Sequence, residues 1–266
     1  MPRRKTEERV LQKLAAGQPL TTKELDDLTK KIGKGQSRKK AREITKSTEA
    51  RYAAQIASMP AGDQQTVARA ISDYTNSSTV INTNCRAGVV DHMITNIDNA
   101  FAAFSRINAD RTRRITYRLT TYKPGDHMPY GAPVAGPGPR ITVGDYIRDD
   151  AYVSASENRQ LLVSGVNNPA AGTRYVKFSI VGIGGINISG GSAYNNQQGV
   201  ALLKYYYPKT WRVRTAQAGQ AEILYARGTI FRVQKITPVG RDVKVVVNIP
   251  DPQPGGMNTK NSFTGA

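Results

Sequence analysis

The sequence predicts an α+β fold, because helical patterns come first along the chain and strand patterns follow. Between about residues 20 and 104 the apolar side chains recur every three or four positions, as on one face of a helix. From about residue 115 apolar and polar residues alternate, as in half-buried strands. Helices grouped before strands favour an α+β domain, and 266 residues suffice for one large domain with an appendage.

Residues 1–62 are predicted to form a basic helical extension. The first 60 residues hold fifteen lysines and arginines against seven acidic residues. Thr21 and Glu24 have the spacing of a capping box at the start of one helix, and another helix is indicated from Arg38 to Ile56. Such a segment can bind nucleic acid or a partner, or can simply present a solvated face, and the sequence leaves these alternatives open.

Residues 63–250 are predicted to form the main domain, followed by a flexible tail over residues 251–266. Two helical stripes lie near residues 67–74 and 90–104, and a loop rich in proline and glycine covers residues 123–140. Strands are indicated at residues 115–120, 151–154, 175–181, 199–207, 221–225, 228–236 and 243–249.

Composition limits the partners and the compartment. The net charge of +18 favours contact with a polyanion such as nucleic acid, an acidic protein surface or a membrane face. The same charge can also serve solubility alone. No apolar run is long enough to span a membrane, and the N-terminus lacks the apolar stretch of a secretory signal. The single cysteine, Cys85, excludes an internal disulfide and fits the cytoplasm, either the protein's own or that of a target cell into which it is delivered.

The first candidate site residue is Arg118, in a strand of alternating pattern. Ile115, Tyr117 and Leu119 share one face of that strand, so Arg118 is expected to point away from them. An arginine there needs an anionic partner. A carboxylate in a salt bridge would satisfy it, and so would a pyrophosphate, which matches the planar guanidinium with two hydrogen bonds.

Two further strands carry the other candidates. Ser154 and Ser156 project to one side of a strand, where two hydroxyls can orient a carboxylate or can simply face water. Glu222 opens a later strand, and Gln220 shares its face if the strand has already begun. A carboxylate in that position can bind a ribose hydroxyl and stabilise a developing oxocarbenium charge, or it can be an ordinary solvent-facing glutamate.

Arginine, then Tyr152-Val-Ser154-Ala-Ser156, then Gln220-Ala-Glu222 is an ordered set that resembles the R-S-E class of mono-ADP-ribosyltransferases in its Gln-x-Glu variant. Further similarity lies in helical and glycine-rich segments: Tyr74-Thr-Asn, Ile81-Asn82, Arg86, Ile183-Gly-Gly-Ile and Gly228-Thr-Ile-Phe231. The resemblance covers about two thirds of the chain. It implies a core of two small packed β-sheets with flanking helices, behind the basic extension.

The resemblance also implies residue roles, with NAD as co-substrate and no metal. Arg118 would hold the NAD phosphates, and Ser154 and Ser156 would shape the pocket and orient Glu222. Glu222 would bind the nicotinamide ribose and promote loss of nicotinamide. The backbone of Leu119 would meet the nicotinamide amide, and Arg159 would contact a phosphate. Leu119 departs from the glycine that usually follows the arginine, and Ala155 departs from the usual central threonine.

The acceptor is the least defined part of this hypothesis. Members that modify arginine carry glutamate where this chain has Gln220, so a protein side chain other than arginine is expected, with RNA or DNA bases as the alternative. An apparent insertion between Tyr194 and Gln220 interleaves aromatic residues with cations, which suits base stacking and phosphate contact but equally suits two ordinary strands. Its candidate residues are Tyr205, Tyr206, Tyr207, Trp211, Arg212 and Arg214.

The competing hypothesis is a non-enzymatic basic protein that binds nucleic acid. It explains the charge and the aromatic cluster, but it leaves the three ordered motifs as coincidence. The only histidines, His92 and His127, lack the spacing of metal ligands, and no Gly-x-Ser-x-Gly motif or Walker loop is present. As an enzyme the protein would be a toxin or effector, with an antitoxin, a chaperone or a delivery protein as further partner.

Overall fold

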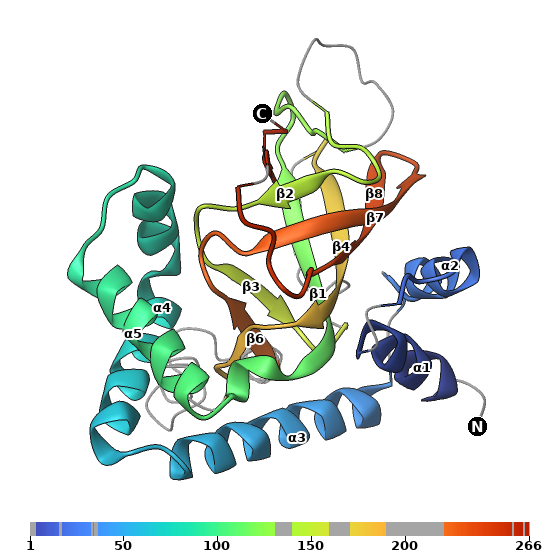
Figure 1. Cartoon of the computed structure of the whole chain (residues 1–266). Helices are drawn as coiled ribbons and strands as arrows, with labels where there is room; N and C mark the ends of the chain where they lie inside the picture. Colours follow the sequence, from blue (N-terminus) through green and yellow to red (C-terminus); the bar gives the residue numbers. More distant parts are fainter. Residues whose placement is uncertain are drawn as a thin grey trace.

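The computed structural model of the chain describes residues 4–15, 18–32, 34, 37–130, 140–159, 171–189, 221–256, 258–262, 264 and 265. Helices precede strands, as the sequence predicts (Figure 1). The helices are α1 (Arg4–Ala15), α2 (Thr22–Lys31), α3 (Arg38–Ala57), α4 (Ala61–Arg86) and α5 (His92–Arg106), and a 3-10 turn, η1, follows at Ala109–Arg111.

Local side-chain chemistry sets the helix boundaries. The predicted capping box is present at α2, where the Thr21 hydroxyl accepts from the backbone N–H of Glu24 and the Glu24 carboxylate accepts from the backbone N–H of Thr21. At α3 and α5 the side chains of Ser37 and Asp91 cap the helix by accepting from the backbone N–H of Lys40 and of Ile94. Helix α4 is kinked at Ser77, where the backbone leaves helical geometry.

The strands are β1 (Arg113–Tyr122), β2 (Tyr146–Arg148), β3 (Val153–Ser156), β4 (Arg174–Ile183), β5 (Ile186–Asn187), β6 (Glu222–Tyr225), β7 (Ile230–Val239), β8 (Asp242–Asn248) and β9 (Lys260–Asn261). Among the described residues they form a single nine-stranded sheet in the order β5-β6-β3-β1-β4-β8-β7-β2-β9, not the two separate sheets that we expected. Only the pair Tyr117 and Ser156 joins β3 to β1, whereas β1 and β4 pair along ten residues. Because this link is so narrow, β5, β6 and β3 can turn away from the other six strands.

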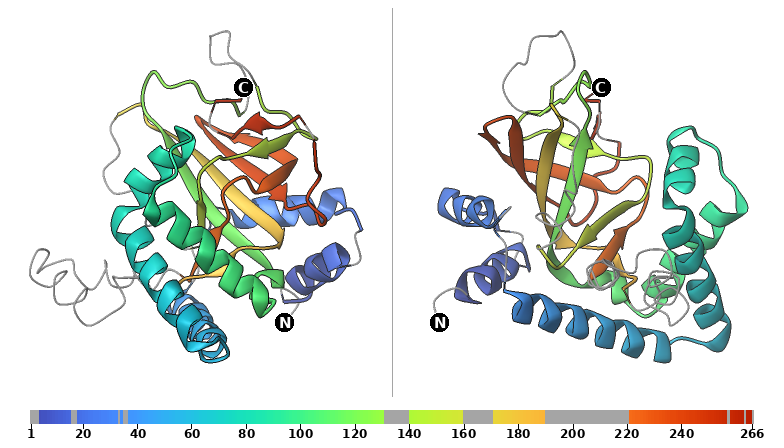
Figure 2. Two further views of the ribbon diagram at one scale, coloured as in Figure 1. Left: turned by 60° about the vertical axis from the view of Figure 1, so that its left-hand side comes forward. Right: turned by 180° about the vertical axis from the view of Figure 1, so that it is seen from behind.

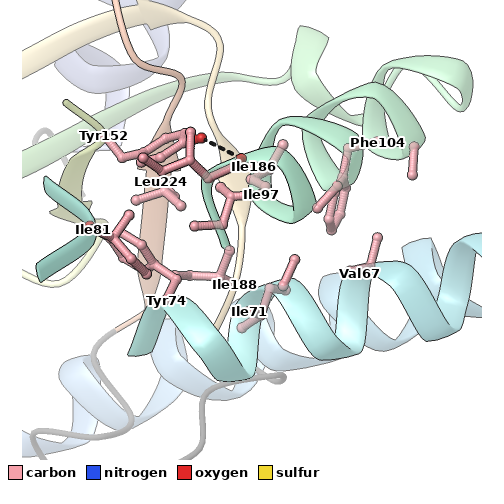
Figure 3. Close-up of a cluster of buried hydrophobic side chains, with 14 of the residues drawn as sticks. Val67, Ile71, Tyr74, Ile81, Ile97, Phe104, Tyr152, Ile186, Ile188 and Leu224 are labelled. Carbon is pink, nitrogen blue, oxygen red and sulfur yellow. Dashed lines mark hydrogen bonds between the residues drawn. The ribbon is translucent and has the colours of Figure 1, made fainter. Parts of the chain in front are cut away.

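The helices α4 and α5 enclose the first hydrophobic cluster against the β3–β6 end of the sheet. Figure 3 shows Tyr74, Ile81 and Ile97 packed around Tyr152 and Leu224. The Tyr152 ring lies edge-on to Tyr74, and its hydroxyl donates to the Ile94 carbonyl at 3.1 Å. This packing fixes the segment that leads into β3.

The first half of the predicted N-terminal extension packs on the sheet. Val10, Leu28 and Ile32 are buried against a cluster from β1, β4 and β8 that consists of Tyr117, Val181 and Val246. Helices α1 and α2 therefore contribute side chains to the core. Helix α3 then runs along the base of the molecule toward α4 (Figures 1 and 2).

Part of the tail also differs from the flexible segment that we expected. Strand β9 pairs in parallel with β2, and the Lys260 ammonium lies 2.7 Å from the Asp145 carboxylate. The Tyr130 hydroxyl donates to the Ser262 carbonyl at 2.9 Å. Backbone pairing and these side-chain contacts hold residues 260–262 on the sheet edge. Among the helices that the structure describes, none combines the length and the apolar character needed to cross a membrane.

Candidate functional site

Three strands bring the candidate arginine, serine and glutamate together. Strand β3 lies between β1, which carries Arg118, and β6, which opens with Glu222. In the antiparallel β3–β6 ladder Ser156 lies opposite Glu222 and Ser154 lies opposite Leu224. Residues opposite one another share a face of the sheet, so both serines and Glu222 face the side of α4 and α5.

The closest polar contact in this group joins Ser154 to Glu222. The Ser154 hydroxyl donates to Glu222 Oε1 at 2.5 Å. Removal from water raises the pKa of the Glu222 carboxyl, and the hydrogen bond from Ser154 lowers it in part. The result is a carboxylate that is oriented by a hydroxyl and poorly solvated, so a positive charge beside it is stabilised more than in water.

Arg118 reaches the same place from β1. Its Nη1 donates to the backbone carbonyl of Ser154 at 2.8 Å. The charges of Arg118 and Glu222 both act on the phenol of Tyr74 in α4, whose pKa is raised to about 12 by burial and by Glu222, with Arg118 opposing. Arginine, serine carbonyl and carboxylate thus converge beneath α4.

The face on which Arg118 lies is not the polar face that the alternating pattern suggested. The arginine does point away from the cluster of Ile115, Tyr117 and Leu119, as predicted. However, its own side borders a small pocket of about 30 Å3 whose lining includes Phe178. Both faces of β1 are buried because α1 and α2 cover the other one, and alternation within one strand does not reveal such a cover.

No carboxylate among the described residues forms an ion pair with Arg118. Burial lowers the pKa of its guanidinium, and the charge of Asp149 opposes that effect. The salt bridge that would have explained Arg118 structurally is therefore not found in the described part of the chain, which leaves its guanidinium able to bind an anionic ligand.

Ser156 has a different set of contacts from Ser154. Its side chain is buried, and its Oγ accepts from the backbone N–H of Asn158 at 2.8 Å, so it shapes the turn after β3. Leu119 contributes its side chain to the outer cluster and its backbone to the β1–β4 ladder, opposite Lys177. Of the two hydroxyls, the one that touches the Glu222 carboxylate belongs to Ser154.

Arg159 lies beyond that turn. Burial raises the pKa of Tyr117, and the charge of Arg159 is one of those that oppose it, so this arginine acts on the face of β1 opposite to Arg118. Its Nε is buried and has no hydrogen-bond partner among the described residues. Gln220 lies outside the described residues, as do the aromatic and basic candidates Tyr205, Tyr206, Tyr207, Trp211, Arg212 and Arg214.

Sequence reasoning did not single out Asp149, the buried acidic residue nearest the site. Both oxygens of its carboxylate accept from Arg86 of α4, at 3.0 and 2.9 Å, and one also accepts from the backbone N–H of Ala151. In the sequence it stands between Arg148 and Asp150, which suggests an exposed polar turn; only the tertiary fold distinguishes it. Arg86 itself belongs to the helical signature noted above.

Within the described ranges no group of three or more potential metal ligands is found. The arrangement offers a carboxylate, a hydroxyl and guanidinium groups. Such a set can bind a phosphorylated sugar and stabilise a cation on it by electrostatics and positioning.

The similarity of the chain to known proteins lies in its structure. No protein-family model matches the sequence, and no curated protein matches it. The chain is similar to the Vis toxin, an ADP-ribosyltransferase from Vibrio splendidus, with a TM-score of 0.57 and 14% identity over 90% of this chain and 98% of that one. The same ADP-ribosyltransferase in complex with M6 inhibitor gives a TM-score of 0.58 and 16% identity over 90% and 97% of the two chains. The structure of that ADP-ribosyltransferase in complex with agmatine gives a TM-score of 0.57 and 14% identity, over 90% of this chain and 97% of that one. The chain thus has the fold of an ADP-ribosyltransferase toxin.

Proposed function

We propose that the protein is a mono-ADP-ribosyltransferase that transfers ADP-ribose from NAD to a macromolecular acceptor. The observation that carries the proposal is the 2.5 Å hydrogen bond from Ser154 to Glu222, made where Arg118 binds the backbone of the same serine. The ordered arginine, serine and glutamate motifs predicted this group, and the fold is one that an ADP-ribosyltransferase toxin uses.

Each residue has a role in this proposal. Arg118 binds the pyrophosphate of NAD, for which an anion-free guanidinium is suited. Ser154 holds the Glu222 carboxylate in place, and Glu222 accepts a hydrogen bond from the nicotinamide ribose. Ser156 shapes the turn beside them. The backbone of Leu119 binds the carboxamide, and Arg159, which follows the turn after β3, contacts a phosphate.

The reaction then follows from electrostatics. The bond between the ribose anomeric carbon and the nicotinamide nitrogen breaks, and nicotinamide leaves with the electron pair. The Glu222 carboxylate stabilises the positive charge that develops on the ribose. An acceptor nucleophile forms the new bond to the anomeric carbon and loses a proton. These roles require no metal.

The acceptor that we propose first is a protein side chain other than arginine, because Gln220 stands where a second carboxylate would help to activate a guanidinium. A base of RNA or DNA is the alternative acceptor, favoured by the net charge of +18. In either case the protein would act as a toxin or effector.

The test uses NAD labelled in its adenylate phosphate, the purified protein and a cell lysate. Glu222→Gln, which removes the charge and keeps the shape, is the control variant. Label that is removed by protease and absent with Glu222→Gln supports a protein acceptor, whereas removal by nuclease supports the alternative. Equal labelling and equal nicotinamide release by wild type and variant would contradict the proposed mechanism.

A further inference from the structure

Helix α3 presents a row of cations on the side that faces away from the sheet. Lys39, Arg42 and Lys46 follow one another at intervals of three and four residues, so they share one face of the helix, and all three are exposed. We call these three residues the α3 basic row. Among the described residues none of them forms an ion pair, and the helix as a whole holds six lysines and arginines against two glutamates.

The opposite face of α3 is fixed to the sheet. Thr48 is buried, and its hydroxyl contacts the Ile44 carbonyl and the Glu157 carboxylate, at 2.8 and 3.1 Å. The side-chain amide of Asn187 in β5 donates to the Thr48 backbone carbonyl. These contacts tie the middle of the helix to the turn after β3 and to β5, so the α3 basic row occupies a set position relative to the candidate site.

This junction leaves the positive charge of the region uncompensated. The Glu157 carboxylate forms an ion pair with Arg51 of α3 and lies 4.0 Å from Arg114 of β1. Arg114 is only 5% exposed, and within the described part of the chain its Nε and Nη1 have no hydrogen-bond partner. One carboxylate therefore serves two arginines, and the α3 basic row adds three more cations, against which the helix itself sets only Glu43 and Glu49.

We propose that the α3 basic row binds the phosphodiester backbone of nucleic acid. Phosphate oxygens are bound mainly by lysine and arginine side chains, and such contacts position a protein on nucleic acid without reading its sequence. Lys39 and Lys46 lie about 10 Å apart along the helix axis, which corresponds to roughly three successive phosphates of one strand at about 3.4 Å each.

A protein partner fits this surface less well. Protein interfaces are depleted of lysine and depend on aromatic or large apolar anchors. The α3 basic row is followed on the same face by Ala50 and Ala53, and the large apolar side chains exposed in the described residues lie on other elements. A row of cations without an anchor suits a polyanion better.

Nucleic acid bound to the α3 basic row would be separated from the strands of the candidate site by helix α3. Glu157 directly follows Ser156, and its backbone N–H donates to the carbonyl of Ala221, the residue before Glu222. The α3 junction is therefore built on the two strands that carry the serine and the glutamate. The binding itself needs neither NAD nor catalysis, so it stands apart from the proposed function.

The test compares two triple variants that change the net charge equally. Lys39→Glu, Arg42→Glu and Lys46→Glu together reverse the α3 basic row. Arg69→Glu, Lys123→Glu and Arg241→Glu together reverse three exposed cations on other elements. Circular dichroism and thermal melting establish that both variants fold. The fluorescence anisotropy of labelled RNA and DNA, as duplexes of about 20 base pairs and as single strands, then gives the affinity across salt concentrations of about 50–200 mM.

We expect the row variant to bind at least about tenfold more weakly than wild type, with a salt slope smaller by roughly 2 to 3, because each phosphate contact contributes about 0.7–0.9. The control variant should stay within about threefold of wild type. Equal losses in the two variants would show only a general effect of charge and would overturn the proposal. So would binding by wild type of polyglutamate or of phosphatidylserine vesicles, but not of RNA or DNA, at the same salt.

The two proposals can fail independently. Nicotinamide release by the row variant, measured with NAD and no macromolecular acceptor, should equal that of wild type, because the α3 basic row does not touch the candidate site. Loss of nucleic-acid binding with normal nicotinamide release supports the inference. Absence of nicotinamide release in wild type would contradict the proposed function and leave the binding result standing.

Discussion

The Ser154 hydroxyl donates a 2.5 Å hydrogen bond to Glu222 Oε1, and this bond opposes the rise in pKa that burial imposes on the carboxyl. The neighbouring hydroxyl of Ser156 instead accepts from the backbone of Asn158. Two serines on one face of β3 therefore have separable effects. One stabilises the ionised carboxylate of Glu222, and the other fixes the turn after the strand.

Ser154→Ala should move the acidic limb of the pH profile to higher pH. Glu222 must be ionised to stabilise the cation, and loss of the hydrogen bond raises its pKa further, so more alkaline conditions are needed. The loss of a hydrogen bond to a charged group should also lower the rate at neutral pH by roughly tenfold or more. Nicotinamide release measured across pH tests this expectation. Ser156→Ala is the matched control, and an equal shift in both variants would contradict the assignment.

Asp149→Ala should destabilise the fold, whereas Asp150→Ala should not. The Asp149 carboxylate is 2% exposed and joins Arg86 of α4 to the backbone of Ala151. Its removal leaves the Arg86 guanidinium and a backbone N–H without their partner, at a cost of about 2 kcal/mol or more. Asp150 pairs with Arg148 where both side chains are 47% exposed, so its loss should change stability by less than about 1 kcal/mol. Urea denaturation of both variants measures the difference.

The local elements could be predicted because their signals are local. The capping box at Thr21 and Glu24 depends on atoms three residues apart, and the sequence predicts it as the structure has it. The roles of Arg118, Ser154 and Glu222 were expected from motif order. Their contacts, however, depend on the pairing of β3 with β6, which spacing along the chain does not determine.

The features that the sequence did not reveal all depend on distant segments. Tyr117 is enclosed because Val10 and Leu28 cover its face of β1. That docking also made the predicted extension part of the core. Whether the strands form one sheet or two depends here on a single residue pair, Tyr117 and Ser156, and no local sequence pattern indicates that this pair forms. Such features depend on long-range packing, so secondary-structure propensity and hydrophobic periodicity cannot predict them.

Glu24→Gln should remove a pH-dependent part of the stability. The Glu24 carboxylate is buried and accepts from the Thr21 backbone and from Lys13, with Arg9 also 3.0 Å away. Burial would raise its pKa, but the hydrogen bonds and the lysine charge together lower it to about 2.

A lowered pKa in the folded state means stability that is present above the unfolded pKa, near 4.5, and is lost as pH falls toward 2. The free energy of unfolding of wild type should therefore exceed that of Glu24→Gln at pH 7, by on the order of 2 kcal/mol, and the difference should shrink progressively below about pH 4.5. Glu8→Gln, at an exposed position of α1, is the control. A difference that stays constant from pH 7 to 2 would contradict the expectation.

Gly185→Ala should destabilise the end of the sheet beside the candidate site. Gly185 lies between β4 and β5 with φ +74°, a conformation that costs alanine about 1 kcal/mol. A Cβ atom there would also lie 2.7 Å from Ile223 Cγ2 and 2.9 Å from the Tyr225 ring, both buried in β6. Because those side chains cannot move without disturbing the strand that Glu222 opens, we expect the free energy of unfolding to fall by about 2–4 kcal/mol.

Gly62→Ala is the matched control, since that glycine lies in the first turn of α4 and no atom outside its own turn lies within 4 Å of the added carbon. It should leave stability unchanged or raise it by about 0.5 kcal/mol. Thermal melting ranks the two variants, and equal melting temperatures would show that the turn at Gly185 tolerates a side chain.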